Sequence, residues 1–289
     1  MTNSMQRWLP LALMLALPWP AQAFTLDFGK IKDTVQNLST AVRDVSEEDE
    51  IELGKGVSAV LLGAAPLVDD AALQTYVNQI GKWLALRSER PKLPWRFGVL
   101  DDNGVNAFAT PGGNIFITRG LLLRMRDEAE LAGVLAHEIS HVVERHALKT
   151  MKKGAWAGLA GNVASFYAEK RGKEEYGRAV SGFTTEVYTR GLDKDDEYAA
   201  DRAGVVLAAR AGYDPYGLAT VLQMLASIGP QDDAVALMFK THPDSGERLE
   251  KVTFLMDGRL DTLADQPRLA DRFARVMEAH LARAQPAKP

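Results

Sequence analysis

Apolar residues recur at three- and four-residue spacing along most of this 289-residue chain, a pattern typical of amphipathic helices. The spacing predicts helices at 52–64, 71–86, 195–210, 214–229, 246–256 and 267–284. A further stretch at 155–167 is rich in Ala and Gly and too short to span a membrane, so we expect a packed or mobile helix there. Helices therefore dominate the predicted fold.

Alternating apolar and polar residues predict three short strands, at 95–100, 105–110 and 114–118. The last two strands are joined by Pro111-Gly112-Gly113, which is a hairpin signal. We therefore expect an α+β fold that is mostly α-helical, with a small three-stranded β-sheet packed on the helix that follows it.

That helix is predicted from unusually apolar sequence. Residues 131–136 contain no polar side chain, and Asp127 and Glu130 have capping-box spacing ahead of them. The signals for its C-terminal end are Lys149, Lys152, Lys153 and then Gly154. We expect one long helix that is buried on most sides.

The apolar run leads into His137-Glu138-Ile139-Ser140-His141, an H-E-x-x-H motif. Residues four apart lie on one face of a helix, so His137 and His141 can bind one metal ion while Glu138 stands beside the attacking water. The alternative is two histidines that flank a glutamate on a solvated face. The apolar surroundings favour the metal, because buried imidazoles and a carboxylate are costly without a partner.

A catalytic zinc usually has a third protein ligand. His146 lies nine residues after His137, on the opposite face of an ideal helix, and is expected to be structural. Glu197 is followed four residues later by Asp201, so a carboxylate ligand can be paired with a second carboxylate that orients a histidine. The alternative is that Glu197 is one more acid of the run that includes Asp193, Asp195 and Asp196.

The N-terminus predicts export. Arg7, the apolar run 8–17 and Ala21-Gln22-Ala23 have the pattern of a cleaved signal peptide at 1–23. The chain has no cysteine, so disulfides, thiolate ligands and a lipidated cysteine are excluded, and a bacterial periplasm is the expected location. No other apolar run is long enough to span a membrane, and we expect no transmembrane span in the mature chain.

Composition and charge exclude two further classes of protein. A content of 46% hydrophobic residues excludes general disorder, and a net charge of −4 gives no reason to expect nucleic-acid binding. We expect a linker or docked helix at 24–47, one metallopeptidase domain at 48–284, and a disordered tail at 285–289.

Four sequence features together resemble the HtpX and CAAX-prenyl-protease family of gluzincin metallopeptidases. They are the motif 137–141, Glu197-Tyr198-Ala199-Ala200-Asp201, His242-Pro243 with Arg248, and Asn106-Ala107-Phe108-Ala109 with the hairpin glycines. The resemblance covers roughly 48–256. It is strongest to the soluble periplasmic branch that includes BepA and LoiP, although this chain has no room for a tetratricopeptide array.

The resemblance implies a zincin-type fold and specific residue roles. The zinc ligands would be His137, His141 and Glu197, with one zinc ion per chain. Glu138 would be the general base and acid, and Asp201 would orient a histidine ligand.

Two further residues keep open roles. His242 can stabilise the oxyanion, or it can occupy the open position of the metal and close a resting site. Arg248 can pair with an active-site carboxylate or with Glu247 or Glu250 on its own helix.

The function implied is a zinc-dependent endopeptidase that acts on unfolded or misassembled envelope proteins in periplasmic protein quality control. Extended or unfolded polypeptides would pair with the strand at 105–110, which we expect to be an exposed edge. An association with outer-membrane proteins is also implied. The alternative is a chaperone-like protein that binds clients and has a plugged, latent zinc site.

Overall fold

The structure is a computed structural model that describes residues 45–150 and 191–284, except 230 and 243. The expected signal peptide at 1–23, the helix at 155–167 and the tail at 285–289 lie outside the described residues. The described N-terminal half contains α2 (Glu47–Ala64), α3 (Ala71–Ala85), β1 (Arg96–Leu100), β2 (Ala107–Thr110), β3 (Asn114–Thr118), α4 (Arg119–Leu122) and α5 (Glu128–Val143). The C-terminal half contains α9 (Lys194–Arg210), α10 (Gly217–Ile228), α11 (Ala236–Thr241), α12 (Ser245–Met256), the 3-10 turn η1 (Asp261–Leu263) and α13 (Ala270–Ala284).

The three strands form one mixed sheet in the order β1-β3-β2. β3 pairs parallel with β1 and antiparallel with β2, with Phe108 opposite Phe116. β2 is therefore an edge strand. The expected α+β fold, mostly helical with a small three-stranded sheet, is confirmed.

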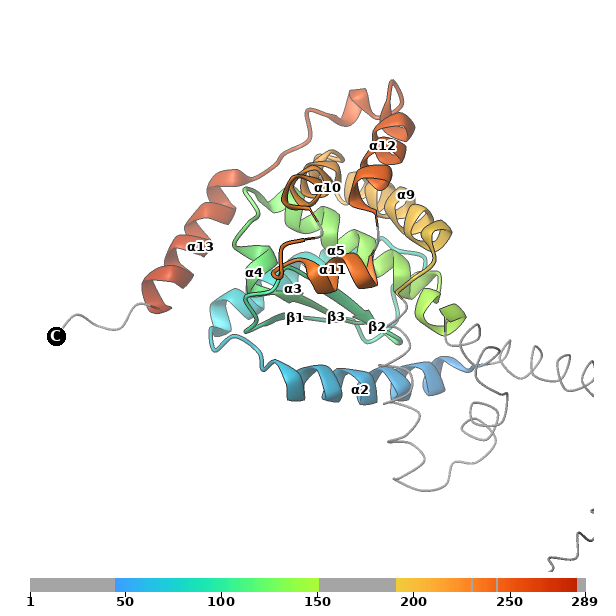
Figure 1. Cartoon of the computed structure of the whole chain (residues 1–289), viewed down its shortest axis with the longest axis vertical. Helices are drawn as coiled ribbons and strands as arrows, with labels where there is room; N and C mark the ends of the chain where they lie inside the picture. Colours follow the sequence, from blue (N-terminus) through green and yellow to red (C-terminus); the bar gives the residue numbers. More distant parts are fainter. Residues whose placement is uncertain (1–44, 151–190, 230, 243, 285–289) are drawn as a thin grey trace, which may run out of the picture.

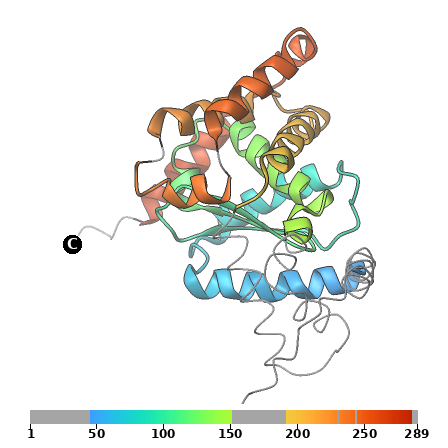
Figure 2. The ribbon, with the colours of Figure 1, turned by 45° about the vertical axis from the view of Figure 1, so that its right-hand side comes forward.

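Helices cover both faces of this sheet. α2 lies along one face, and α5 lies on the other, as Figures 1 and 2 show from two directions. The main core fills the space between β1, β3, α3 and α5, with Leu73, Ile115 and Leu135 fully buried. α5 is thus held between the sheet and the later helices α9 and α10.

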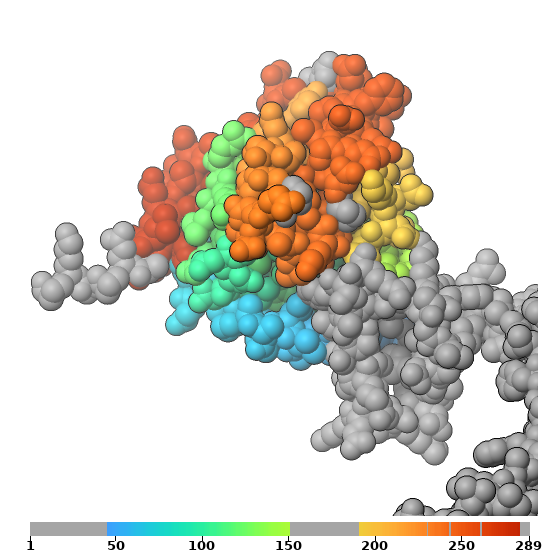
Figure 3. Space-filling model, in the orientation of Figure 1, coloured from blue at the N-terminus to red at the C-terminus, as the bar shows by residue number. Residues whose placement is uncertain are grey.

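α5 is buried over almost its whole length. Its N-cap is Asp127, whose side chain accepts a hydrogen bond from the Glu130 N–H, as the capping spacing predicts. Every residue from Glu128 to Val142 is buried. In the space-filling view, the orange segment that contains α11 and α12 covers the front of the molecule (Figure 3). The motif helix therefore lies inside the fold.

The end of this helix differs from the prediction. α5 stops at Val143 instead of continuing to the lysines, and a second helical segment occupies 146–150. The break is at Arg145, whose φ of 56° is left-handed. Its Nε lies 2.9 Å from Oε2 of buried Glu50, an ion pair that holds the turn in place.

Other boundaries also differ. α2 begins at Glu47, because the Ser46 side chain caps it and its acidic first turn suits a helix N-terminus. Glu47–Glu50 are therefore part of α2, and residues 24–44 of the expected linker or docked helix lie outside the described residues. The short helices α4 and α11 were not predicted, since four to six residues carry too little periodicity. Among the described residues, no helix has the length and apolar character needed to cross a bilayer.

Candidate active site

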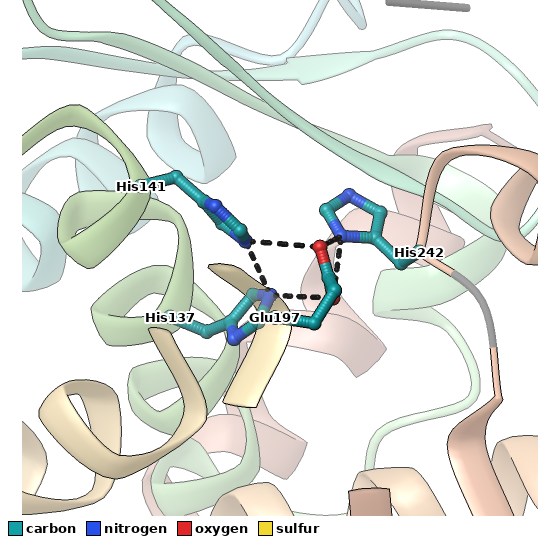
Figure 4. Close-up of side chains that lie close together, drawn as sticks. All are labelled: His137, His141, Glu197 and His242. Carbon is teal, nitrogen blue, oxygen red and sulfur yellow. Dashed lines mark hydrogen bonds and ion pairs between the residues drawn. The ribbon is translucent and has the colours of Figure 1, made fainter. Parts of the chain in front are cut away.

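Four buried side chains converge at the centre of the fold. His137 and His141 come from α5, Glu197 from the first turn of α9, and His242 from the residue after α11. One ligand atom from each lies within 4.8 Å of the others, and Figure 4 shows the four side chains pointing toward one another. His137 Nε2 is 2.9 Å from His141 Nε2, and the two nitrogens lie 3.6 and 3.4 Å from the Glu197 carboxylate oxygens.

A close approach of two helices brings Glu197 to the histidines. α9 packs across α5 at Gly204, where a Cβ atom would lie 2.9 Å from the backbone nitrogen of His137. Real Cβ contacts are not that short, so only glycine permits this distance. Seven residues earlier on α9, Glu197 then reaches the imidazoles.

Asp201 and Arg248 support the cluster from behind. Asp201 Oδ1 is 3.0 Å from His137 Nδ1, which is the orienting contact expected from the sequence. Arg248 comes from α12 and pairs with two acids of α9, at 2.9 Å from Glu197 Oε2 and 2.7 Å from Asp201 Oδ1. Of the two alternatives for Arg248, the structure shows pairing with the active-site carboxylates.

His242 and Glu138 lie on the remaining side. His242 Nδ1 is 2.9 Å from Glu197 Oε1, and its Nε2 is 3.8 Å from Glu138 Oε1. Both side chains are buried. His242 is thus placed both beside the acid proposed as the base and among the candidate ligands.

Burial and charge set the protonation of these groups in different directions. Burial and the Arg248 charge act to lower the pKa of His137, but hydrogen bonds to Asp201 and Glu197 outweigh them and raise it to about 9. Burial and the neighbouring His137 hold the pKa of His141 well below its usual value. The positive charge therefore lies on His137, and His141 is neutral.

The carboxylates also differ from each other. Burial acts to raise the pKa of Glu197, yet the charges of His242 and Arg248 bring it well below its usual value. Burial raises the pKa of Glu138, which has no arginine as direct partner in the described structure. Glu197 is therefore ionised, and Glu138 is the better proton acceptor of the two.

His141 has a contact behind it that the sequence does not predict. His146 Nδ1 lies 2.8 Å from His141 Nδ1, and His146 Nε2 lies 3.4 Å from Asp196 Oδ1. The expected position on the opposite face was wrong, because the turn at Arg145 brings His146 back toward the site. No Gly or Pro marks that turn, so the sequence gives no signal for it.

A pocket borders the cluster and the edge strand. Its lining includes Glu138, His141 and His242, the β2 residues 107–110, and apolar side chains from α2 and from 146–150. The apolar members include Val57, Leu61, Phe108 and Leu148. A polypeptide lying against β2 would pass Glu138.

Comparison with known proteins agrees with this arrangement. Residues 71–255, which include all seven predicted site residues, match peptidase family M48. The chain belongs to this family. Membership confirms the expected enzyme class, a metallopeptidase, and the resemblance found in the sequence.

Named relatives of this M48 chain are proteases. The beta-barrel assembly-enhancing protease of Escherichia coli (strain K12) is 29% identical over 77% of this chain and 47% of its own length. The protease HtpX homolog of Acidiphilium cryptum is 34% identical over 75% of this chain and 77% of its own length. The mitochondrial metalloendopeptidase OMA1 of Arabidopsis thaliana is 30% identical over 64% of this chain and 36% of its own length. The chain spans about half the length of the beta-barrel assembly-enhancing proteases it matches.

The donor atoms of this M48 site could hold a metal ion. Two ligands of a tetrahedral ion at about 2.0–2.1 Å lie roughly 3.3 Å apart. His137, His141 and Glu197 offer atoms separated by 2.9, 3.4 and 3.6 Å. Two imidazole nitrogens 2.9 Å apart need either a proton or a cation between them, and a metal ion can take the place of the proton.

Proposed function

We propose that this chain is a zinc-dependent endopeptidase with His137, His141 and Glu197 as the ligands of one zinc ion. The observation that carries the proposal is the convergence of these three donors beside Glu138, in a pocket that borders an edge strand. Two imidazoles and one carboxylate are a donor set that suits zinc, and three protein ligands leave one position open.

Glu138 and Asp201 have chemical tasks in this proposal. Bound zinc supplies Lewis acidity, which polarises the scissile carbonyl and activates water. Glu138 takes the proton of the attacking water and passes it to the leaving amine, a task that its raised pKa favours. Asp201 holds His137 in the tautomer that presents its Nε2 to the site.

The edge strand supports a substrate in extended conformation. Just before β2, the Asn106 carbonyl accepts from the Thr118 N–H at 3.0 Å, and within β2 Phe108 lies opposite Phe116. The alternation of an antiparallel ladder then directs the backbone groups of Ala107 and Ala109 away from β3. The Ala107 N–H already donates to the Asn106 side-chain oxygen at 2.9 Å. An extended chain can pair with the backbone groups of Ala109 and with the Ala107 carbonyl, and this selects for unfolded polypeptide more than for particular side chains.

The cellular role rests on the relatives and the N-terminus. Several relatives are named beta-barrel assembly-enhancing protease, and the first 23 residues have the pattern of a signal peptide. We place the chain in the bacterial periplasm, where it would cleave unfolded or misassembled envelope proteins. Association with outer-membrane proteins is part of this proposal.

The position of His242 favours a second candidate. Its ring belongs to the four-residue metal cluster, so it can be a fourth ligand that closes the site. The protein would then bind clients without cleaving them. His242→Ala separates the two roles: faster cleavage indicates a plug, and slower cleavage with full zinc content indicates oxyanion stabilisation.

The first experiment measures zinc content and casein cleavage on the same samples of mature protein. We expect about one zinc per chain and cleavage in the wild type, and loss of both in Glu197→Ala. Glu138→Gln should keep the zinc and lose about 10²- to 10⁴-fold in turnover. The matched control is Glu250→Ala, which changes an exposed acid of α12 and should alter neither property.

The possible results separate the candidates. Tight zinc without cleavage in the wild type favours the latent site. A wild-type protein without zinc contradicts the metallopeptidase itself. Cleavage of a folded control protein as fast as an unfolded one contradicts the substrate class.

A further inference from the structure

His141 and His146 lie in contact through the same ring atom. The two Nδ1 atoms are 2.8 Å apart, and both side chains are buried. A hydrogen bond between two neutral imidazoles needs one proton between these nitrogens. Which ring carries that proton decides which nitrogen of His141 keeps a lone pair for a metal ion.

The carboxylate of Asp196 decides this question. Asp196 comes from the first turn of α9, and its Oδ1 lies 3.4 Å from His146 Nε2. This contact is long for a hydrogen bond, and the buried Nε2 has no other hydrogen-bond partner among the described residues. A lone pair on Nε2 would face a negative charge, so the proton of His146 belongs on Nε2.

The position of this proton fixes which nitrogen donates in the contact between His146 and His141. With its proton on Nε2, His146 accepts at Nδ1 from the Nδ1–H of His141. His141 therefore has its lone pair on Nε2. That atom faces the cluster, at 2.9 Å from His137 Nε2 and 3.4 Å from Glu197 Oε1.

We infer that His146 is a positioning residue that fixes the tautomer and ring orientation of His141, with Asp196 as the terminal acceptor. The inference rests on the proposed function, since it assigns support to a proposed metal ligand. Asp201 orients His137 by a direct contact with its Nδ1, and His146 orients His141 in the same way through an imidazole.

The turn at Arg145 makes this contact possible. A continued helix would carry His146 to the opposite face, and the left-handed φ of Arg145 reverses its direction. Glu50 holds the turn through Arg145 Nε at 2.9 Å. The contact is thus built by three separate elements: α2, the 144–145 turn and α9.

The test compares two substitutions of His146 in the full mature protein. His146→Leu keeps similar volume and cannot accept a hydrogen bond, and we expect about 10- to 100-fold weaker zinc binding in chelator competition. His146→Asn places an amide oxygen near the position of Nδ1, and we expect it to retain most of the affinity. A purely packing role would make Leu the better substitute.

Folding is measured separately by circular dichroism and thermal unfolding of the chelator-treated proteins. A folded His146→Leu protein with wild-type zinc affinity overturns the inference, as does an Asn variant that loses as much as Leu. If the wild type binds no zinc, the proposed function fails instead.

A second measurement holds even if His146→Leu does not fold. Nitrogen-15 NMR of the zinc-loaded wild type reports which ring nitrogens carry protons. We expect Nδ1–H for His141 and Nε2–H for His146. Finding Nδ1–H on His146 would contradict the relay.

Discussion

Arg248 Nη1 lies 2.9 Å from Glu197 Oε2, and the same guanidinium holds Asp201 Oδ1 at 2.7 Å. One arginine of α12 therefore pairs with two buried acids that stand one turn apart on α9. Burial acts to lower the pKa of Arg248, but the charges of Asp201 and Glu197 outweigh it and raise the pKa above its usual value. The charged form is held strongly.

Removing this charge should destabilise the fold. Arg248→Met leaves two buried carboxylates without their counter-charge, and we expect a loss of about 3–5 kcal/mol in the free energy of unfolding. Arg248→Lys keeps the charge but cannot form the two-pronged contact, so its loss should be smaller. Urea unfolding with excess chelator measures both. A Met variant as stable as Lys would refute this account.

The helix contact at Gly204 gives a second prediction. In Gly204→Ala the new Cβ meets the His137 backbone at 2.9 Å, so α9 must move away from α5. We expect a loss of about 1–3 kcal/mol in stability and weaker zinc binding, because Glu197 moves with the helix.

A matched glycine tests whether the effect is local. Gly246 lies on α12 with nothing within 4 Å of an added Cβ. Gly246→Ala should stabilise the protein by up to about 1 kcal/mol through the higher helix propensity of alanine, and should leave zinc affinity unchanged. Equal effects of the two substitutions would mean that helix propensity, and not the contact, is responsible.

The sequence predicts which side chains converge, because each predicted pair depends only on the regular spacing of one helix. His137 and His141 are one helical turn apart, and so are Glu197 and Asp201, and each pair acts from one helix. The strands at 95–100 and 114–118 are also predictable from alternation and a hairpin signal. The local sequence pattern is sufficient to predict a pair of site residues wherever one helix supplies both.

Contacts that depend on a turn without a sequence signal are not predictable in this way. Arg145 adopts a left-handed conformation although it is neither Gly nor Asn. Its buried partner Glu50 is distant in the sequence and belongs to α2. His146 therefore reaches His141 through tertiary structure alone. The partner of Arg248 is also not predictable from the sequence, because its own helix offers the acids Glu247 and Glu250 as alternatives.

The edge strand gives a prediction about substrate pairing. Ala109→Pro removes an N–H that points away from β3, so the ladder to β3 should survive while pairing with an extended substrate is weakened. One lost hydrogen bond corresponds to a roughly 2- to 10-fold lower kcat/KM. Steady-state cleavage of a flexible peptide measures this, together with zinc content.

Ala109→Ser is the matched control, because it changes the side chain and keeps the N–H. It should cleave the peptide like the wild type. Equal kcat/KM values for the Pro and Ser variants would show that the substrate does not pair with this edge.

The last prediction concerns acid stability at the other end of the molecule. Asp70 caps α3, and its Oδ2 accepts hydrogen bonds from α13 at 2.9 Å from His280 Nδ1 and 2.7 Å from Arg283 Nη2. Burial acts to raise the pKa of Asp70, but these hydrogen bonds outweigh it and lower the pKa from 3.8 to about 2.

The sign of the pH effect follows from this lowered pKa. The ionised carboxylate stabilises the folded state fully above 3.8, and the contribution is lost as the pH falls toward about 2. Asp70→Asn keeps an N-cap but removes the charge. We expect the variant to be less stable than the wild type near neutral pH, and the difference to shrink as the pH falls through this window. Urea unfolding across the acid range measures it. A difference that stays constant down to the lowest pH would show that the charge of Asp70 does not hold α13 on α3.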